Sequence, residues 1–220
     1  MPRLPTCIGV DVGGAQKGFH AVALHPDDSI EQFASPSPGD VAAWCRRAGG
    51  NLIAIDAPCR WRAEENVRAA ELALVRSGVR CFWTPTRRAA MSHPTGFFDW
   101  MLAGERLYLA LATTHPLLGP RPRSGTSACF ETYPHAAACR LAGHPLDVRR
   151  KRADRLGVLA AAGIDGKGLR SQDAIDAAIC ALVARAVSSG QAEALGDAGD
   201  GLIHLPPIPR PRASPMLAPS

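Results

Sequence analysis

The chain has 220 residues, of which 46% are hydrophobic, and carries a formal net charge of +5 at pH 7. This length and composition suit one large domain, and the absence of about 18 consecutive apolar residues predicts no membrane span. The seven cysteines form no C-x-x-C pair, which argues against a disulfide framework and a zinc site and predicts a cytoplasmic protein. The first residues contain no long apolar stretch, so we expect no signal peptide.

Most of the positive charge comes from arginine. An arginine-rich surface suits a partner that carries phosphate, such as a nucleic acid, but a general bias in composition would give the same balance. The charge is therefore compatible with nucleic-acid binding and does not establish it.

The first part of the chain predicts three strands, one helix and a fourth strand. The expected strands cover 6–12, 19–24, 29–35 and 51–58, and the helix runs over 40–47 with Asp40 as its cap. Short turns join the first three strands. This order predicts an antiparallel meander followed by a crossover to a parallel strand.

The rest of the chain predicts mainly helices. Helices are expected over 62–77, 97–113, 151–163 and 171–186, and strands over 79–85, 128–135 and 201–207. In the first of these helices, Arg62, Glu64, Glu65 and Arg68 are expected to face solvent. Residues 121–127 form a basic loop. The Pro-rich segment 207–220 is expected to be a disordered tail, which leaves residues 1–206 as one domain.

Five carboxylates lie in segments that otherwise look buried: Asp11, Asp56, Glu131, Asp173 and Asp176. A buried carboxylate without a partner costs several kcal/mol, so each needs a partner, a strand end or a metal ion. Each also has an ordinary explanation. Asp11 is also typical of a turn residue. Asp56 is typical of a side chain that bonds to its own backbone, and Glu131 of one that pairs with an arginine. The two acids of the last helix suit the positive end of its dipole, although Asp176 lies a turn further in.

The predicted topology brings several of these acids together. If the strand at 51–56 lies parallel to the strand at 7–12, Asp11 and Asp56 end at the same sheet edge, on strands about 4.8 Å apart. A helix across that edge would add Asp173 and Asp176, which share one face. Oxygen ligands select hard cations such as Mg²⁺ or Mn²⁺, and two such ions promote phosphodiester hydrolysis.

An ordered series of short motifs resembles the DUF429 family of predicted RNase H-like nucleases. The pieces are "GVDVGG", "AIDAP", "RAEENVRAAEL" before "FWTP", "ETYPHA", and "DAIDAAICALVA" before "GLIHLP", and they cover roughly residues 7–206. The resemblance implies an α/β fold with an RNase H-like mixed sheet, an antiparallel meander plus parallel strands, flanked by helices. It also implies a set of metal ligands for Mg²⁺ or Mn²⁺: Asp11, Asp56, Asp173 and Asp176. Glu131 and His135 match the family's E-x-x-P-H piece and join the acids as candidate catalytic residues.

Other side chains have both a functional and an ordinary interpretation. His135 suits a general base, or a histidine packed at a helix start. Trp83 and Trp100 suit base stacking, or burial in the core. Several arginines suit phosphate clamps, or solvated surface positions: Arg60, Arg62, Arg87, Arg88, Arg121 and Arg123. The run at 149–152 is typical of a solvated helix face.

We therefore expect a metal-dependent nuclease that hydrolyses phosphodiester bonds. One alternative is an actin-like or sugar-kinase-like ATP-binding phosphotransferase, because "DVGG" resembles the first phosphate loop of that fold. Against it, "AIDAPCR" lacks the glycine that a second phosphate loop needs. Another alternative is a non-catalytic nucleic-acid-binding module on the same fold.

Overall fold

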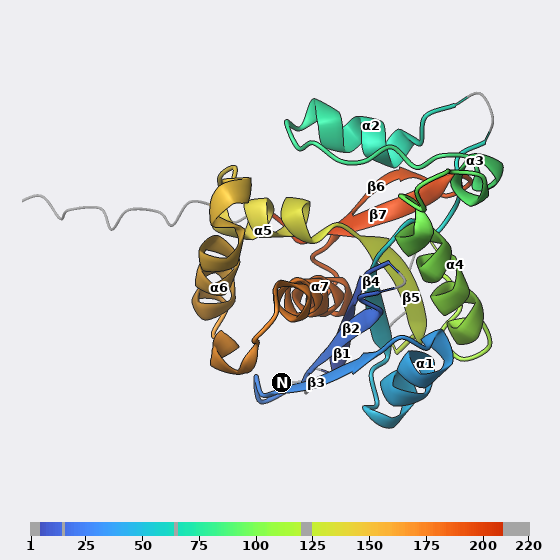
Figure 1. Ribbon diagram of the computed structural model, residues 1–220. Helices are drawn as coiled ribbons and strands as arrows, with labels where there is room; N and C mark the ends of the chain where they lie inside the picture. The colour runs from blue at the N-terminus through green and yellow to red at the C-terminus, as the bar shows by residue number, and fades with distance from the viewer. Residues whose placement is uncertain (1–4, 15, 64–65, 120–124, 209–220) are drawn as a thin grey trace, which may run out of the picture.

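A seven-stranded mixed sheet forms the centre of the structure, a computed structural model that describes residues 5–14, 16–63, 66–119 and 125–208 (Figure 1). The strands are β1 (Cys7–Val12), β2 (Phe19–Leu24), β3 (Ile30–Ser35), β4 (Leu52–Asp56), β5 (Ala128–Thr132), β6 (Glu193–Asp197) and β7 (Gly201–Leu205). Their order is β3-β2-β1-β4-β5-β7-β6. Pairing is antiparallel from β1 to β3, parallel among β1, β4, β5 and β7, and antiparallel between β6 and β7. The predicted meander and crossover are confirmed.

Helices cover both faces of this sheet (Figure 1). They are α1 (Pro38–Arg47), α2 (Ala69–Arg76), α3 (Arg87–Met91), α4 (Asp99–Leu111), α5 (Pro134–Ala142), α6 (Lys151–Ala161) and α7 (Gln172–Ser188), with two 3-10 turns, η1 (Val148–Arg150) and η2 (Gly166–Gly168). One core lies between the sheet and α1 and α4. A larger core lies on the opposite face, beneath α5, α6 and α7. Among the described residues, no helix has the length and apolar character needed to cross a bilayer.

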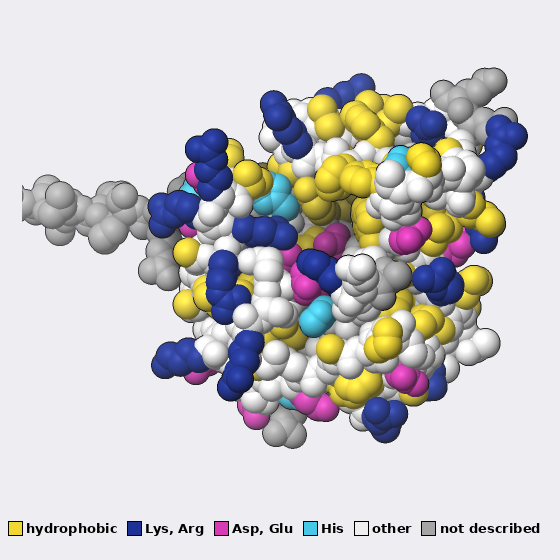
Figure 2. All heavy atoms as spheres, in the orientation of Figure 1, with side chains coloured by type: hydrophobic (Ala, Val, Ile, Leu, Met, Phe, Trp, Pro, Cys, Tyr) yellow, Lys and Arg dark blue, Asp and Glu magenta, His cyan; other side chains and the backbone are white. Residues whose placement is uncertain are grey.

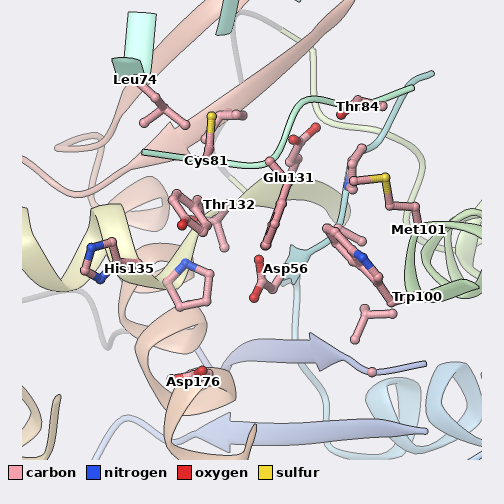
Figure 3. A pocket seen from close by; sticks show the side chains of 18 of the residues that line it. Asp56, Leu74, Cys81, Thr84, Trp100, Met101, Glu131, Thr132, His135 and Asp176 are labelled. Atoms are coloured by element: carbon pink, nitrogen blue, oxygen red, sulfur yellow. The ribbon is translucent and has the colours of Figure 1, made fainter. Parts of the chain in front are cut away.

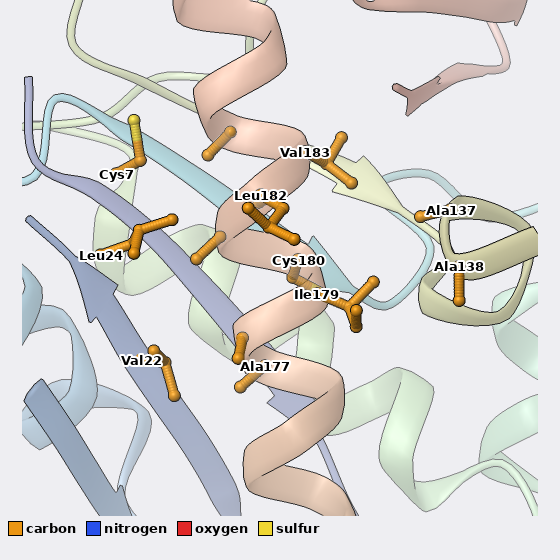
Figure 4. Packing of buried hydrophobic residues seen from close by; sticks show 14 of the residues in the cluster. Cys7, Val22, Leu24, Ala137, Ala138, Ala177, Ile179, Cys180, Leu182 and Val183 are labelled. Atoms are coloured by element: carbon orange, nitrogen blue, oxygen red, sulfur yellow. The ribbon is translucent and has the colours of Figure 1, made fainter. Parts of the chain in front are cut away.

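Helix α7 lies directly on β1 because Gly9 has no side chain. A Cβ atom on Gly9 would lie 2.0 Å from the Ala177 carbonyl oxygen and 2.3 Å from the Ala181 nitrogen. Figure 4 shows Ala177 and Cys180 of the helix above the strands that carry Cys7 and Val22. The contact brings the first turns of α7 to the end of β1 that carries Asp11. Any larger residue at position 9 would force the helix outward.

Several predicted boundaries are confirmed together with their capping residues. Ser171 begins α7, and its hydroxyl accepts a hydrogen bond of 3.0 Å from the Ala174 N–H. Gly163 follows the end of α6 with φ +82°, a conformation that glycine adopts without strain. In α1, however, the cap is Ser37 rather than Asp40. The Ser37 hydroxyl accepts from the Asp40 N–H at 3.2 Å, and Pro38 occupies the first turn, where a missing N–H costs nothing.

Two predictions for the middle of the chain are wrong. The helix predicted over 62–77 is found only over Ala69–Arg76, and residues 79–85 form an irregular segment rather than a strand. Cys81 and Phe82 of this segment line a pocket instead of pairing in a sheet. Arg68, expected at the surface, has only 1% of its area exposed. Residues Glu64, Glu65, 121–124 and 209–220 lie outside the described part of the chain, so predictions for them are not compared.

Candidate functional site

A pocket of about 590 Å³ opens at the carboxyl ends of β1, β4 and β5. This volume lies within the range of about 300–1,000 Å³ that is typical of ligand sites. Figure 2 shows hydrophobic side chains around a hollow, with acidic, basic and histidine side chains along one side. In Figure 3, Leu74 and Cys81 lie on one side of the pocket and Trp100 and Met101 on the other, with Asp56 between them. Parallel strands commonly place ligand sites at this edge.

Asp11 and Asp56 lie side by side at this edge. They are paired positions of the parallel strands β1 and β4. Burial raises the pKa of Asp56 to about 7, although the cations Arg155 and Lys151 oppose the shift. Burial, and then the charges of Asp56 and Asp173, raise the pKa of Asp11 well above its usual value. Both carboxyl groups are therefore harder to deprotonate than an exposed aspartate.

The two acids of α7 lie nearby and are paired with cations. Asp173 accepts from the Lys17 ammonium at 3.2 Å. Asp176 is buried, lies 2.8 Å from the Lys151 Nζ, and forms an ion pair with Arg155. Lys151 and Arg155 also act electrostatically on Asp56, so these cations stand among the four aspartates. All four acids face one region, and basic side chains of this chain balance part of their charge.

The cation run predicted as a solvated face contributes to the site. Lys151 and Arg155 share one face of α6, because residues four apart are neighbours on a helix. Lys151 is half-buried and Arg155 is buried, and both line the pocket. Sequence reasoning missed both residues as site components. The spacing of four residues between Lys151 and Arg155 indicated that they share a helix face, but the sequence did not show that this face of α6 would turn toward the pocket.

Glu131 forms an ion pair with an arginine, Arg68, which is the structural alternative to a catalytic role considered from the sequence. The Arg68 guanidinium donates to both carboxylate oxygens of Glu131, at 2.9 and 2.6 Å, and the Cys59 N–H donates at 2.8 Å. Arg68 also reaches Glu71, which accepts from the Thr84 N–H at 3.1 Å and from the Thr84 hydroxyl. This buried network fixes the 80–84 segment against β5. Both oxygens of Glu131 are thus engaged, although its side chain lines the pocket.

His135 lies at the start of α5, half-buried, and lines the pocket. Burial, followed by the charges of Arg155 and Lys151, lowers the pKa of this imidazole. The side chain is therefore neutral at pH 7 and able to accept a proton. Its Nε2 lies 3.9 Å from the Cys139 Sγ, a weak contact that leaves the ring accessible to the pocket.

The remaining candidates are distributed over the surface and the pocket rim. Trp100 lines the pocket, whereas Trp83 is 43% exposed and does not belong to the core. Arg87 pairs with Glu105 at 2.9 Å, Arg60 is exposed, and Arg62 is half-buried. Arg121 and Arg123 lie outside the described residues.

A ready-made metal cluster is absent from the described residues: no three His, Cys, Asp or Glu side chains are grouped so that they could hold an ion. Asp11 and Asp56 of the strands are paired positions. Asp173 and Asp176 of α7 lie near them but are paired with cations, Asp173 with Lys17 and Asp176 with Lys151 and Arg155. The roles of Asp11, Asp56, Asp173, Asp176, Glu131 and His135 therefore stay predictions.

Taken together, the fold and the pocket define an α/β protein with a carboxylate pair at the carboxyl edge of a mixed sheet. Over residues 9–200 the chain matches the family described as a protein of unknown function (DUF429), and it belongs to that family. No curated protein and no solved structure matches it.

Proposed function

We propose that this chain is an RNase H-like, divalent-metal-dependent nuclease that hydrolyses phosphodiester bonds. The observation that carries the proposal is the Asp11–Asp56 pair, a buried and a half-buried carboxyl group in register on adjacent parallel strands. The strand order β3-β2-β1-β4-β5, with an antiparallel meander and parallel β1, β4 and β5, supports the RNase H-like placement. The approach of the α7 acids to the same edge supports it further.

The chemistry of the carboxylate pair suits a hard divalent cation. Burial disfavours the charged form of both carboxyl groups and raises the pKa of each, and the charges of Asp56 and Asp173 add to the shift at Asp11. A cation removes that cost, and an all-oxygen donor set selects Mg²⁺ or Mn²⁺. Asp11 and Asp56 would hold the ion. Asp173 and Asp176 would complete the set of ligands. To do so, each would release its lysine partner, Lys17 or Lys151, and bind the ion instead. Such an ion, when bound, makes a coordinated water more acidic and balances charge on a phosphate.

The chain's own side chains supply the rest of the proposed chemistry. Lys17 and Lys151 are partly exposed ammonium groups beside the acids and are placed to bind a phosphate that enters the pocket. Neutral His135 would accept a proton from a water molecule bound in the pocket. Arg68 would hold Glu131 in place through its two hydrogen bonds to the carboxylate oxygens, beside Asp56 in the pocket.

The proposal is tested by cleavage assays on single-stranded DNA and RNA, duplex DNA, hybrid and branched substrates, in Mg²⁺, Mn²⁺ or EDTA. We expect cleavage of at least one substrate with metal, and its loss by orders of magnitude in Asp11→Asn and Asp56→Asn. Asp165→Asn is the matched control, since Asp165 caps an exposed turn far from the pocket and asparagine caps equally well. Absence of cleavage everywhere, or cleavage unaffected by both site variants, would refute the proposal.

The ATP-binding alternative keeps one supporting observation: the Gly13–Gly14 turn after β1 lines the pocket. Calorimetry with ATP and Mg²⁺ separates the two proposals. Micromolar binding without nucleic-acid cleavage would favour a phosphotransferase. Strongly salt-dependent binding of nucleic acid that is indifferent to metal and to the site variants would favour a non-catalytic module.

A further inference from the structure

One half of the pocket has a composition that phosphodiester chemistry does not require. Beside the acids, its wall is apolar and aromatic, formed by Leu74, Cys81, Phe82, Trp100 and Met101. These residues come from α2, the 80–84 segment and α4, and Figure 3 shows four of them around the space above Asp56. A single pocket thus joins a charged end, suited to phosphate, to an apolar end.

The rim of the apolar end exposes aromatic rings to solvent. Phe82 is 64% exposed and Phe97 is 49% exposed, and their rings meet edge to face with centroids 5.7 Å apart. Trp83 follows Phe82 in the chain and is also largely exposed. Exposed aromatic rings next to cationic groups are typical of sites where unpaired bases stack. Arg80 lines the same pocket and adds positive charge at this end.

A buried carboxylate oxygen in the same wall has no partner. Glu71 lines the pocket and is buried, and its Oε2 accepts no hydrogen bond from the described residues. An unsatisfied buried acceptor is costly, so it favours a ligand that brings an N–H donor. An exocyclic amino group of a nucleobase is such a donor.

We infer that the pocket accepts one unpaired nucleobase next to the scissile phosphate, so the substrate is a single strand or a strand with an extrahelical base. The base would lie against Phe82 and Trp100, with its phosphate toward Lys17 and Lys151. A base inside a duplex is stacked and paired, and must leave the stack before it can enter a concave pocket. This inference rests on the proposed nuclease function, whose substrate class it names.

Binding at fixed salt tests this inference. Fluorescence anisotropy would compare a labelled single strand with the blunt duplex of the same sequence, in an Asp11→Asn background that prevents cleavage. We expect the single strand to bind at least tenfold more tightly. Phe82→Leu should weaken single-strand binding roughly 5- to 150-fold, the range for one stacked base. Phe82→Tyr should preserve binding, because it keeps an aromatic ring.

The control is Leu109→Ala, which removes a 70% exposed apolar side chain outside the pocket and should leave binding unchanged. Cytosine oligomers should bind severalfold more tightly than thymine oligomers, because only cytosine carries an amino group for Glu71. Equal affinities for the two oligomers would remove Glu71 from base recognition. Duplex binding as tight as single-strand binding, or no effect of Phe82→Leu, would overturn the inference.

Cleavage by the wild-type chain separates this inference from the proposed function. If the wild-type chain cleaves with Mn²⁺ while the binding comparison fails, only the base pocket is wrong. If the base binds as expected and nothing is cleaved under any metal condition, the nuclease proposal is wrong. The pocket would then be a binding site for single strands.

Discussion

Asp11 and Asp56 are paired positions on adjacent parallel strands, Asp11 buried and Asp56 half-buried, and burial raises the pKa of both carboxyl groups. This burial destabilises the folded state when the two carboxyl groups are ionised. Each carboxyl group has a pKa above its usual value, so deprotonating the pair is harder in the folded state than in the unfolded state. The pH dependence of stability follows from this pair, and the proposed metal binding and chemistry rest on it.

The first prediction concerns stability and pH. The pKa of Asp56 is about 7 when folded and near 3.8 when unfolded. The folded state therefore holds a proton that the unfolded state has lost between about pH 4 and pH 7. The stabilising contribution is full below pH 4 and falls as the pH rises through 7, by about 1.4 kcal/mol per unit of pKa difference. Urea unfolding at pH 5 and pH 8 should show a smaller pH-dependent loss in Asp56→Asn. Identical losses in the variant and the wild type would contradict this account.

The second prediction concerns divalent metal in the absence of substrate. A cation that binds only the folded chain stabilises it, by about 2.7 kcal/mol when its concentration is 100 times the Kd. We expect Mg²⁺ or Mn²⁺ to raise the melting temperature at pH 8, EDTA to reverse the rise, and Asp11→Asn to abolish it. Asp165→Asn should keep the full response. Equal shifts in wild type and Asp11→Asn would place the bound ion elsewhere.

The third prediction concerns the contact between β1 and α7. Gly9→Ala places a methyl group within 2.3 Å of two backbone atoms of α7, so we expect a loss of at least 1–3 kcal/mol or a failure to fold. Gly157→Ala is the comparison, because position 157 is in the exposed part of α6 with no atom near a new Cβ. That change should stabilise the chain by about 0.5–1 kcal/mol. Denaturant midpoints measure both, and a neutral Gly9→Ala would show that the helix can shift without cost.

The fourth prediction concerns the buried ion pair of Arg68 and Glu131. Arg68→Met leaves Glu131 buried without its cation, which costs about 3–5 kcal/mol in such pairs. Arg87→Met breaks the exposed pair with Glu105, and surface pairs contribute only about 0–1 kcal/mol. Chemical denaturation of the two variants should therefore differ severalfold in the stability lost. A double variant, Arg68→Met with Glu131→Gln, should recover part of the loss.

The sequence carried enough information to predict the pairing of Asp11 with Asp56. Both residues end short apolar runs, and a crossover connection makes such runs neighbouring parallel strands. The partner of Glu131 was harder to assign. Arg68 follows a charged stretch that resembles a solvated helix face, and its burial depends on β5, the turn at Asp200 and the 80–84 segment meeting around it. Nothing near Arg68 in the sequence reports those distant contacts.

The same distinction separates the elements that were predicted from those that were not. Helix α7 has a capping serine and a long apolar run, so local signals define it. Residues 79–85 have strand-like apolar character, yet they pair with no strand of the sheet, and Cys81 and Phe82 line the pocket instead. The orientation of Lys151 likewise depends on how α6 packs on α7, which local sequence does not specify.

The close seating of α7 on Gly9 also bears on how the protein is made. Asp11 and Asp56 leave the ribosome well before the helix that carries Asp173 and Asp176, because β1 and β4 precede α7 by more than a hundred residues. Until then, the β1 surface around Gly9 has no cover, and the acids of the sheet edge lack half of their surroundings. A nascent chain therefore cannot bring the four acids together before α7 has emerged, and the proposed nucleolytic activity would begin only then, beside the ribosome's own RNA.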